Sequence, residues 1–514
     1  SYAESMDKTL ELSSTYNHKF GAHNLDVVGG YSFQEFNGDS FSANNLDFLV
    51  DGLKEWDLGS GTYLTDGKAG MSSHKNATTR LIAFLGRVNY SYRDRYLATL
   101  NMRYEGSSKF YNNRWGTFPG ISAGWRLSSE EFMNRYKNFL DDLKIRVSYG
   151  VTGNQGFDAS VAYRMYNPDS WTYYNNQWIR VYGLKQNQNR DLKWETKKEF
   201  DIGLDFSFFD HRFSGRLDYY NRKIKDAIYS GIQVPSPPAV FPTSTVNIGT
   251  IKNSGFEFEL SGIPIQTNDW TYRTSIVGNV LGKSRLEEMA TDTHLELYAI
   301  PHGGGSAVRI FGGQEIGQFY LFRFAGVREE DGTPMIYDND GNMVPYSSRT
   351  DAIRVQTGRA LPPLQLSWNN SINYRNWDFS AYFRSSIGND IYNVTDMLQG
   401  INSKITTGQN VLRTAYERNA PITNTEELML LDYWLEDGSF FKLDNITLGY
   451  SLPKGKIKYL NSVRGYLSMH NVFTLTKYSG LDPEVNINGL APGFEDFGAY
   501  PRTRTFIFGI QVGL

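Results

Sequence analysis

Long segments of this chain alternate apolar and polar residues with a period of two, and this pattern limits the fold more than any other feature. It fills residues 81–92, "LIAFLGRVNYSY", and residues 199–209, "EFDIGLDFSFF". The first segment has Ile82, Phe84, Val88, Tyr90 and Tyr92 on one face and Arg87, Asn89 and Ser91 on the other. Because successive side chains of a β-strand point to opposite faces, the pattern predicts an all-β, antiparallel fold.

Two kinds of protein use such strands: soluble sheets, and transmembrane β-barrels with one lipid-facing and one lumen-facing side. The lengths of the connections separate the two. Short connections fall at 20–23, 93–95, 209–212, 262–268 and 374–377, and long ones at 37–78, 152–194, 225–252, 282–363, 388–439 and 474–501. Short and long loops alternate in this way in bacterial outer-membrane barrels. The chain has no run of about 18 apolar residues, so a spanning structure has to be a β-barrel.

Composition narrows the functional classes. The 514 residues carry a net charge of −3, which gives no electrostatic basis for binding nucleic acid. The chain has no Cys, which excludes disulfides, thiolate zinc sites and cysteine nucleophiles. Aromatic residues make up 15% of the chain, a content that suits strands. We expect no cofactor.

One motif imitates a hydrolase. "GISAG" (120–124) fits G-x-S-x-G, and "HGGG" (302–305) resembles an oxyanion loop. The chemistry needs the oxyanion loop earlier in the chain and the serine on a strand-to-helix turn, whereas Ser122 lies inside an alternating segment. We therefore expect no enzymatic activity and no catalytic residues.

A second motif, "DNDGN" (338–342), suggests a calcium loop. With Gly341 at the sixth loop position, Ile336 and Ser347 would stand where an EF-hand needs carboxylate ligands. We expect a β-turn here and no metal site.

The segment "SWTYYNNQWIRVYG" (170–183) gathers large aromatic residues in an Asn-rich loop. Aromatic faces beside amide donors suit stacking on sugar rings or contact with peptide backbones. The same residues could instead pack the loop on its neighbours or contact a partner protein. The candidate substrate-binding residues are Trp171, Tyr173, Tyr174 and Trp178.

Several segments, in this order along the chain, resemble the SusC/RagA family of TonB-dependent transporters from the outer membrane of Bacteroidetes. The resemblance runs from about residue 80 to the end. The segments that carry it are "LKIRVSYGVTGNQ" (143–155), "NRDLKWETKKEFDIGLDFSFFDHRFSGRLDYYNRKIKDAIY" (189–229), "VNIGTIKNSGFEFELSG" (246–262), "IGQFYLFRFAGV" (316–327), "DFSAYFRSSIGNDIYN" (378–393), "EDGSFFKLDNITLGYSLP" (436–453), "NVFTLTKYSGLDPEVN" (471–486) and "YPRTRTFIFG" (500–509).

The resemblance implies a 22-stranded barrel plugged by an N-terminal domain. The alternating segments give roughly 15 strands, so residues 1–514 are expected to be the C-terminal portion of the barrel domain, with the plug and the first strands upstream. It also implies import of oligosaccharides or oligopeptides, with a SusD-like surface lipoprotein as a lid and TonB supplying energy.

The segment "YPRTRTFIFGIQVGL" (500–514) is expected to be the closing strand of the barrel. Its apolar face would contact outer-membrane lipid, while Thr505, Gly509 and Gln511 face the lumen. By resemblance, such a terminal strand is also the signal read by the outer-membrane assembly machinery. The apolar face consists of Phe506, Phe508, Ile510, Val512 and Leu514, and the residues expected to keep the lumen polar are Arg87, Asp201, Asp205, Arg216 and Asp218.

Two alternatives to an energised importer remain at this point. One is a soluble extracellular β-protein that binds or degrades glycans; it would have irregular loop lengths and a pair of catalytic carboxylates. The other is a porin-like channel without an energy source, which would lack a plug domain and a TonB-binding segment.

Overall fold

The computed structural model describes residues 1–50, 52, 54–289, 294–300, 305–423, 428–453, 455–457, 459–495 and 497–513. Strands dominate, as the alternating pattern predicts. The two α-helices within these residues are short, α1 (Thr62–Thr65) and α2 (Val394–Gln399). Over the described part of the chain, no helix has the length and apolarity that a membrane crossing requires.

The described residues form one large sheet of 17 strands. Two of them, β3 and β16, are short strands within connections, which leaves the fifteen strands that the sequence predicts. The strands are β1 (Tyr2–Phe20), β2 (His23–Asn44), β3 (Gly70–Lys75), β4 (Thr79–Tyr92), β5 (Tyr96–Ser107), β6 (Trp115–Arg126), β7 (Leu140–Asn154), β10 (Glu195–Phe208), β11 (Phe213–Lys225), β14 (Gly249–Gln266), β15 (Trp270–Leu281), β16 (Arg285–Met289), β24 (Leu364–Tyr374), β25 (Trp377–Ile387), β28 (Phe440–Ser451), β29 (Ser462–Thr476) and β30 (Thr505–Gly513).

The chain divides into two compact units, and β6, β7, β10 and β11 each contribute residues to both. The first unit contains residues 1–123, 149–198 and 224–248. In it β1 pairs with β2, β2 with β3 and β4, and β4 with β5, all antiparallel. The turns are tight because Gly21, Arg93 and Asp94 adopt positive φ. Two further hairpins lie in the long connections, β8 (Tyr166–Tyr174) with β9 (Gln177–Leu184), and β12 (Ile228–Gln233) with β13 (Thr243–Asn247).

A buried aromatic cluster in the first unit joins Phe118 of β6 to residues of the long connections. Trp194 contacts Phe110 and Phe118, with ring centroids 4.9 and 5.3 Å apart, and its indole N–H donates to the carbonyl of Arg114. The burial of these rings joins the connection after β5 to the end of the connection before β10. The cluster consists of Phe110, Phe118, Phe157, Val161, Leu192 and Trp194.

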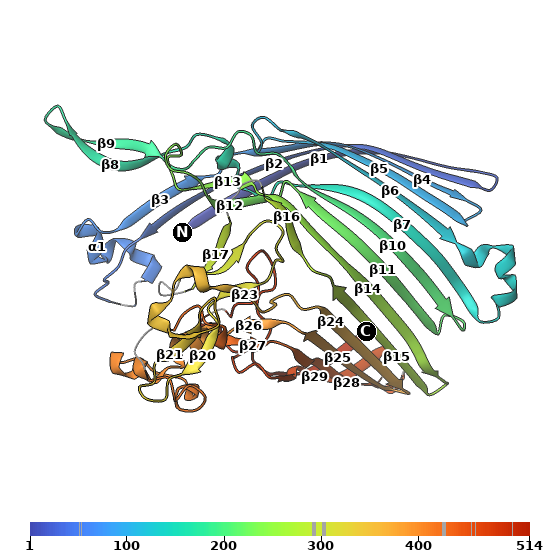
Figure 1. Cartoon of the computed structure of the whole chain (residues 1–514). Helices are drawn as coiled ribbons and strands as arrows, with labels where there is room; N and C mark the ends of the chain where they lie inside the picture. Colours follow the sequence, from blue (N-terminus) through green and yellow to red (C-terminus); the bar gives the residue numbers. More distant parts are fainter. Residues whose placement is uncertain are drawn as a thin grey trace. The chain divides into compact units, whose positions relative to one another are not determined.

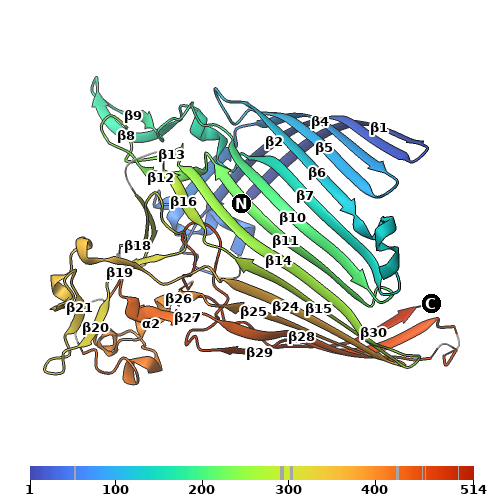
Figure 2. The same cartoon turned by 45° about the vertical axis from the view of Figure 1, so that its right-hand side comes forward.

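The second unit contains residues 124–148, 199–223 and 249–514. Its strands β14, β15, β24, β25, β28, β29 and β30 pair in that order, each antiparallel to the next. The short strand β16 pairs with the first residues of β14. Figures 1 and 2 both show β14, β15, β24 and β25 side by side. The segment predicted to close the barrel forms β30, which pairs with β29 from Thr505 opposite His470 to Gly513 opposite Ser462.

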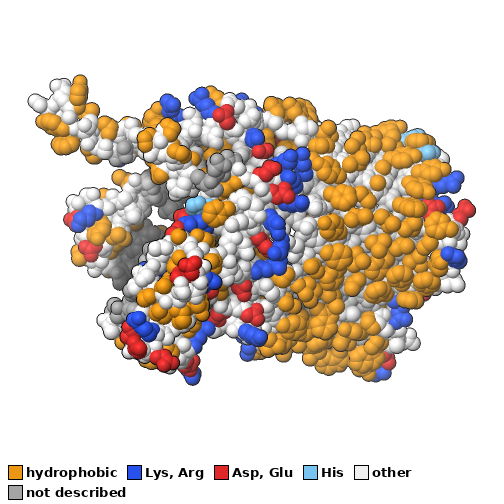
Figure 3. Space-filling view, in the orientation of Figure 1, with side chains coloured by type: hydrophobic (Ala, Val, Ile, Leu, Met, Phe, Trp, Pro, Cys, Tyr) orange, Lys and Arg blue, Asp and Glu red, His pale blue; other side chains and the backbone are white. Residues whose placement is uncertain are grey.

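The strands of the second unit have two different faces. On one face of β14, β15 and β24, Glu257 lies opposite Asn279, which lies opposite Gln365. On the other face, hydrophobic side chains gather over β14 and β15, as the space-filling view shows (Figure 3). The exposed apolar residues on this face of the two strands are Phe256, Ile265, Trp270, Ile276 and Val280. A broad apolar surface of this kind suits contact with lipid.

Side chains on both faces of β30 are exposed, the polar Thr505 and Gln511 as well as the apolar residues. Phe506, Phe508, Ile510 and Val512 are exposed, and Phe508 keeps 74% of its surface accessible. The ring of Tyr466, on β29, covers Gly509, because a Cβ at this position would clash with that ring. Leu514, the last residue of the predicted apolar face, lies outside the described residues.

Three long connections of the second unit fold together into a body with its own core, which we call the loop body: residues 282–363, 388–439 and 477–504. Tyr392 forms a parallel bridge with Phe494, and Phe322 forms one with Leu431. Phe319 packs edge-on against Phe494, with ring centroids 5.1 Å apart. Small strands of the loop body are β17 (Leu295–Ala299), β18 (Ser306–Ile310), β19 (Phe319–Leu321), β20 (Phe324–Val327), β21 (Pro334–Tyr337), β22 (Met343–Pro345), β23 (Val355–Thr357), β26 (Asp390–Tyr392) and β27 (Leu435–Asp437).

We predict that Phe508→Glu destabilises the folded protein in the membrane by about 1–2 kcal/mol, because a charge on a lipid-facing strand position is unfavourable, although less so for acidic than for basic residues. The heat-modifiable mobility of the folded protein in outer-membrane fractions measures this effect. Gln511→Glu on the same strand is the matched control and should leave the folded fraction unchanged. Equal loss in both variants would contradict the assignment of the two faces.

Candidate functional site

The predicted aromatic residues lie on the hairpin of β8 and β9 in the first unit. Its turn is Asn175-Asn176, both at positive φ, as a two-residue hairpin turn requires. Tyr173 lies opposite Trp178, with ring centroids 5.4 Å apart in an edge-on arrangement. Trp171 lies opposite Arg180, whose guanidinium carbon is 5.9 Å from the Trp171 ring centroid.

The structure therefore brings three of the four predicted aromatic residues to one face of the hairpin. Tyr174 follows Tyr173 in β8 and lies on the opposite face. Trp171 and Trp178 are exposed over 61% and 66% of their surface. Sequence reasoning did not include Arg180 in this group, although its place two residues after Trp178 already predicts a shared strand face.

A second candidate is a charged group on the polar face of the second unit. Arg146 on β7 donates two hydrogen bonds to Asp205 on β10, at 2.8 and 2.9 Å, and one to Asp218 on β11 at 2.8 Å. Arg216 pairs with the other oxygen of Asp218 at 2.7 Å. Arg146, Arg216 and Asp218, together with Asp201, border an open cavity of about 740 Å³, which continues along β14, β15 and β24.

Arg146 reaches across β10 only because Gly203 has no side chain. A Cβ at Gly203 would lie 2.3 Å from a carboxylate oxygen of Asp218 and 2.5 Å from the Arg146 guanidinium. Four of the five residues predicted to be polar and inward-facing, Asp201, Asp205, Arg216 and Asp218, thus belong to one group. The fifth, Arg87, lies on β4 in the first unit.

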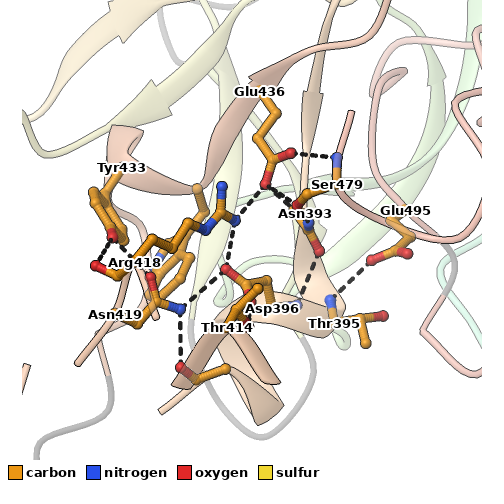
Figure 4. Close-up of polar contacts among 12 residues, drawn as sticks. Asn393, Thr395, Asp396, Thr414, Arg418, Asn419, Tyr433, Glu436, Ser479 and Glu495 are labelled. Atoms are coloured by element: carbon orange, nitrogen blue, oxygen red, sulfur yellow. Dashed lines mark hydrogen bonds and ion pairs between the residues drawn. The ribbon is translucent and has the colours of Figure 1, made fainter. Parts of the chain in front are cut away.

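The third candidate is a polar cluster inside the loop body (Figure 4). Asn393 caps α2 by accepting a hydrogen bond from the backbone N–H of Asp396 at 2.9 Å. Asp396 is 1% exposed and also accepts hydrogen bonds from Thr414, Arg418 and Asn419. These bonds tie α2 to the segment around residue 418, so that the charge of Asp396 is compensated.

Glu436 on β27 joins this cluster to the connection after β29. It accepts from Arg418, from the side-chain amide of Asn393 at 3.0 Å, and from the backbone N–H and hydroxyl of Ser479 at 2.7 and 2.8 Å. Burial would raise the pKa of Glu436, but the hydrogen bonds from Arg418 and Ser479 outweigh it and hold the pKa below its ordinary value.

Glu484 forms ion pairs that hold the connection after β29 against the strands. Its carboxylate contacts Arg384 of β25 at 2.6 Å, Lys442 of β28 at 2.9 Å and Arg502 at 2.6 Å. Burial would raise the pKa of Glu484, and the cations Lys442 and Arg384 lower it overall. Sequence reasoning missed Glu436 and Glu484 as interacting residues, although both lie in segments that carried the family resemblance.

The serine motif at 120–124 and the calcium-loop candidate at 338–342 lie in ordinary structural settings. Ser122 is inside β6, as the alternation predicts. Asp338 accepts hydrogen bonds from the backbone N–H groups of Asp340 and Asn342 and closes the turn between β21 and β22, which confirms the predicted β-turn. Residues 302–304 of the "HGGG" segment lie outside the described residues.

Comparisons with known proteins agree on one family. Residues 2–472 match the family model described as "TonB dependent receptor-like, beta-barrel". "TonB-dependent receptor P3" of Formosa agariphila is 30% identical over 99% of this chain and 52% of its own length. "TonB-dependent receptor SusC" of Bacteroides thetaiotaomicron is also 30% identical, over 99% of this chain and 53% of its own length. The chain thus spans about half the length of these curated relatives.

Among solved structures, the RagAB peptide transporter shares the fold. It superposes with a TM-score of 0.83 at 22% identity, over 99% of this chain and 56% of that chain. The large antiparallel sheet is therefore a barrel fold of the TonB-dependent receptor type, as the resemblance predicted.

We predict that Glu436→Gln lowers the free energy of unfolding of the loop body by about 1–3 kcal/mol at pH 7, because it removes a charged acceptor from buried donors. The folded-state pKa of Glu436 lies below its ordinary value of 4.5. Its ionised form therefore stabilises the folded state above pH 4.5 and loses this effect as the pH falls through the lowered pKa.

Thermal unfolding of the detergent-solubilised protein at pH 7 and at pH 3 measures this contribution. The difference between wild type and Glu436→Gln should be clear at pH 7 and should shrink at pH 3. Glu417→Gln, an exposed carboxylate of the same loop, serves as the control. A difference that is unchanged at pH 3 would disprove the role of the ionised carboxylate.

Proposed function

Because the chain belongs to the TonB dependent receptor-like β-barrel family of the outer membrane, we propose that it is the barrel portion of an active importer of oligomeric nutrients. The match over residues 2–472 is the observation that carries this proposal. The sheet supports it with an apolar face suited to lipid and a polar face with a wide, charged cavity. Such a wall lets large hydrophilic cargo pass without contact with hydrocarbon.

The cargo class that we propose is oligosaccharides or oligopeptides. This chain is similar in sequence to the curated relative SusC. Its similarity to the solved RagAB peptide transporter is one of fold. In this proposal a SusD-like surface lipoprotein covers the loops, and TonB supplies the energy for import. The chain itself makes and breaks no covalent bond.

The exposed face of the β8–β9 hairpin is the proposed first contact for cargo. Trp171, Tyr173 and Trp178 present flat aromatic surfaces, and Arg180 adds a donor beside them. Aromatic faces of this kind stack on the apolar side of sugar rings or on peptide groups. A two-residue turn and paired strands keep these rings in place before cargo arrives, which reduces the entropy lost on binding.

We predict that uptake of labelled oligosaccharide or oligopeptide by cells producing the whole protein falls to background when TonB is inactivated. A monosaccharide small enough for porins serves as the control and should enter at an unchanged rate. Cargo uptake that persists without TonB would favour a passive, porin-like channel over the proposed importer.

We also predict that Trp178→Ala and Trp171→Ala each weaken cargo binding about 2- to 12-fold, since one aromatic contact is worth about 0.5–1.5 kcal/mol beyond its area. Tyr174→Ala, on the opposite face of the same hairpin, is the matched control. Binding of labelled cargo to purified protein measures the effect. If cargo binding is unchanged while copurification of a surface lipoprotein is lost, the hairpin contacts the partner instead.

A further inference from the structure

The loop body contains a second cavity, separate from the charged cavity on the strands. It has a volume of about 340 Å³, which is large enough for a small organic group. Leu412, Leu481 and Phe497 form its apolar side, and Asp396 and Glu495 are the charged residues that line it. Among the described residues, no Lys, Arg or His lines this cavity.

The two carboxylates differ in how their charge is compensated. Asp396 forms an ion pair with Arg418 at 2.6 Å. Glu495 is 4% exposed, and one of its oxygens accepts a hydrogen bond from the backbone N–H of Thr395 at 2.9 Å. Within the described part of the chain, no cationic side chain forms an ion pair with Glu495. A buried carboxylate without a cation is unfavourable unless something else supplies the positive charge.

A second polar group, the Tyr478 hydroxyl, lies beside this cavity and against Glu495. Tyr478 is 5% exposed, and its buried hydroxyl interacts with the Glu495 carboxylate and has no other hydrogen-bond partner among the described residues. The hydroxyl lies next to Gly480, which lines the cavity, since a Cβ there would come within 2.4 Å of it. Burial, together with the negative charge of Glu495, raises the pKa of Tyr478. Its oxygen is therefore neutral at physiological pH and can accept a hydrogen bond.

We propose that this cavity binds a protonated primary amine carried on a short apolar or polyol body. Such an ammonium group supplies the positive charge that Glu495 lacks and has N–H donors for the Glu495 carboxylate, which lines the cavity. The volume and the apolar side formed by Leu412, Leu481 and Phe497 suit an organic cation better than a bare ion. A peptide N-terminus and an amino sugar both carry this group.

The test measures binding to the full protein in detergent by isothermal titration calorimetry. The probes are L-leucinamide and D-glucosamine, and their neutral counterparts are N-acetyl-L-leucinamide and N-acetyl-D-glucosamine. At least one amine should bind, and its N-acetylated form should bind about 10- to 100-fold more weakly, the usual effect of losing a charged hydrogen bond. Preference for leucinamide indicates a peptide N-terminus, and preference for glucosamine indicates an amino sugar.

Glu495→Gln should weaken amine binding by the same factor, because its amide oxygen still accepts from Thr395 but carries no charge. Tyr478→Phe should weaken binding severalfold, because it removes the hydroxyl that lies against the Glu495 carboxylate and keeps the buried ring. Glu417→Gln, an exposed carboxylate outside the cavity, is the control. The proposal is wrong if neither amine binds, if the N-acetylated forms bind equally well, or if both cavity variants bind amines like the wild type. None of these measurements requires import to occur.

Discussion

Backbone hydrogen bonding within the membrane is the constraint on which the rest of this structure depends. In hydrocarbon every N–H and C=O has to pair within the protein, and a strand can do so only through its neighbours in a sheet. Alternate side chains of each strand are then committed to lipid. What remains for recognition is the inward-facing half of the strand residues and the long connections, and the candidate sites lie there: Arg146 and its carboxylates on the polar face, the aromatic hairpin, and the loop body.

The strand part of the fold could be predicted from the sequence because alternation is a local signal. Ile82, Phe84 and Val88 identify one face of β4 without reference to any other segment. The alternation of short and long connections further indicates that the protein is an outer-membrane β-barrel. The aromatic hairpin could be predicted only in part. The sequence identifies its four aromatic residues as a group, but their division between two faces depends on the Asn175-Asn176 turn.

The loop body could not be predicted, because its contacts join segments far apart in the chain and follow no period. Tyr392, Phe494 and Phe319 come from three different connections. Glu495 in the sequence is one acidic residue among many, and only burial and the lack of a cation distinguish it. Glu436 and Glu484 did lie in segments that resembled a known family, and the structure supplies a physical reason for such segments: each carboxylate joins the connection after β29 to another part of the second unit.

The contacts of Glu484 also limit how the loop body can move. Arg384 and Lys442 belong to β25 and β28, so residues 477–504 are anchored to two strands of the wall by charged hydrogen bonds. Swinging this connection outward as a rigid flap would separate a largely buried carboxylate from its cations, which is strongly unfavourable. A ligand bound by residues 477–504 therefore keeps its position relative to β25 and β28. A conformational change that opens the passage has to take place in another segment.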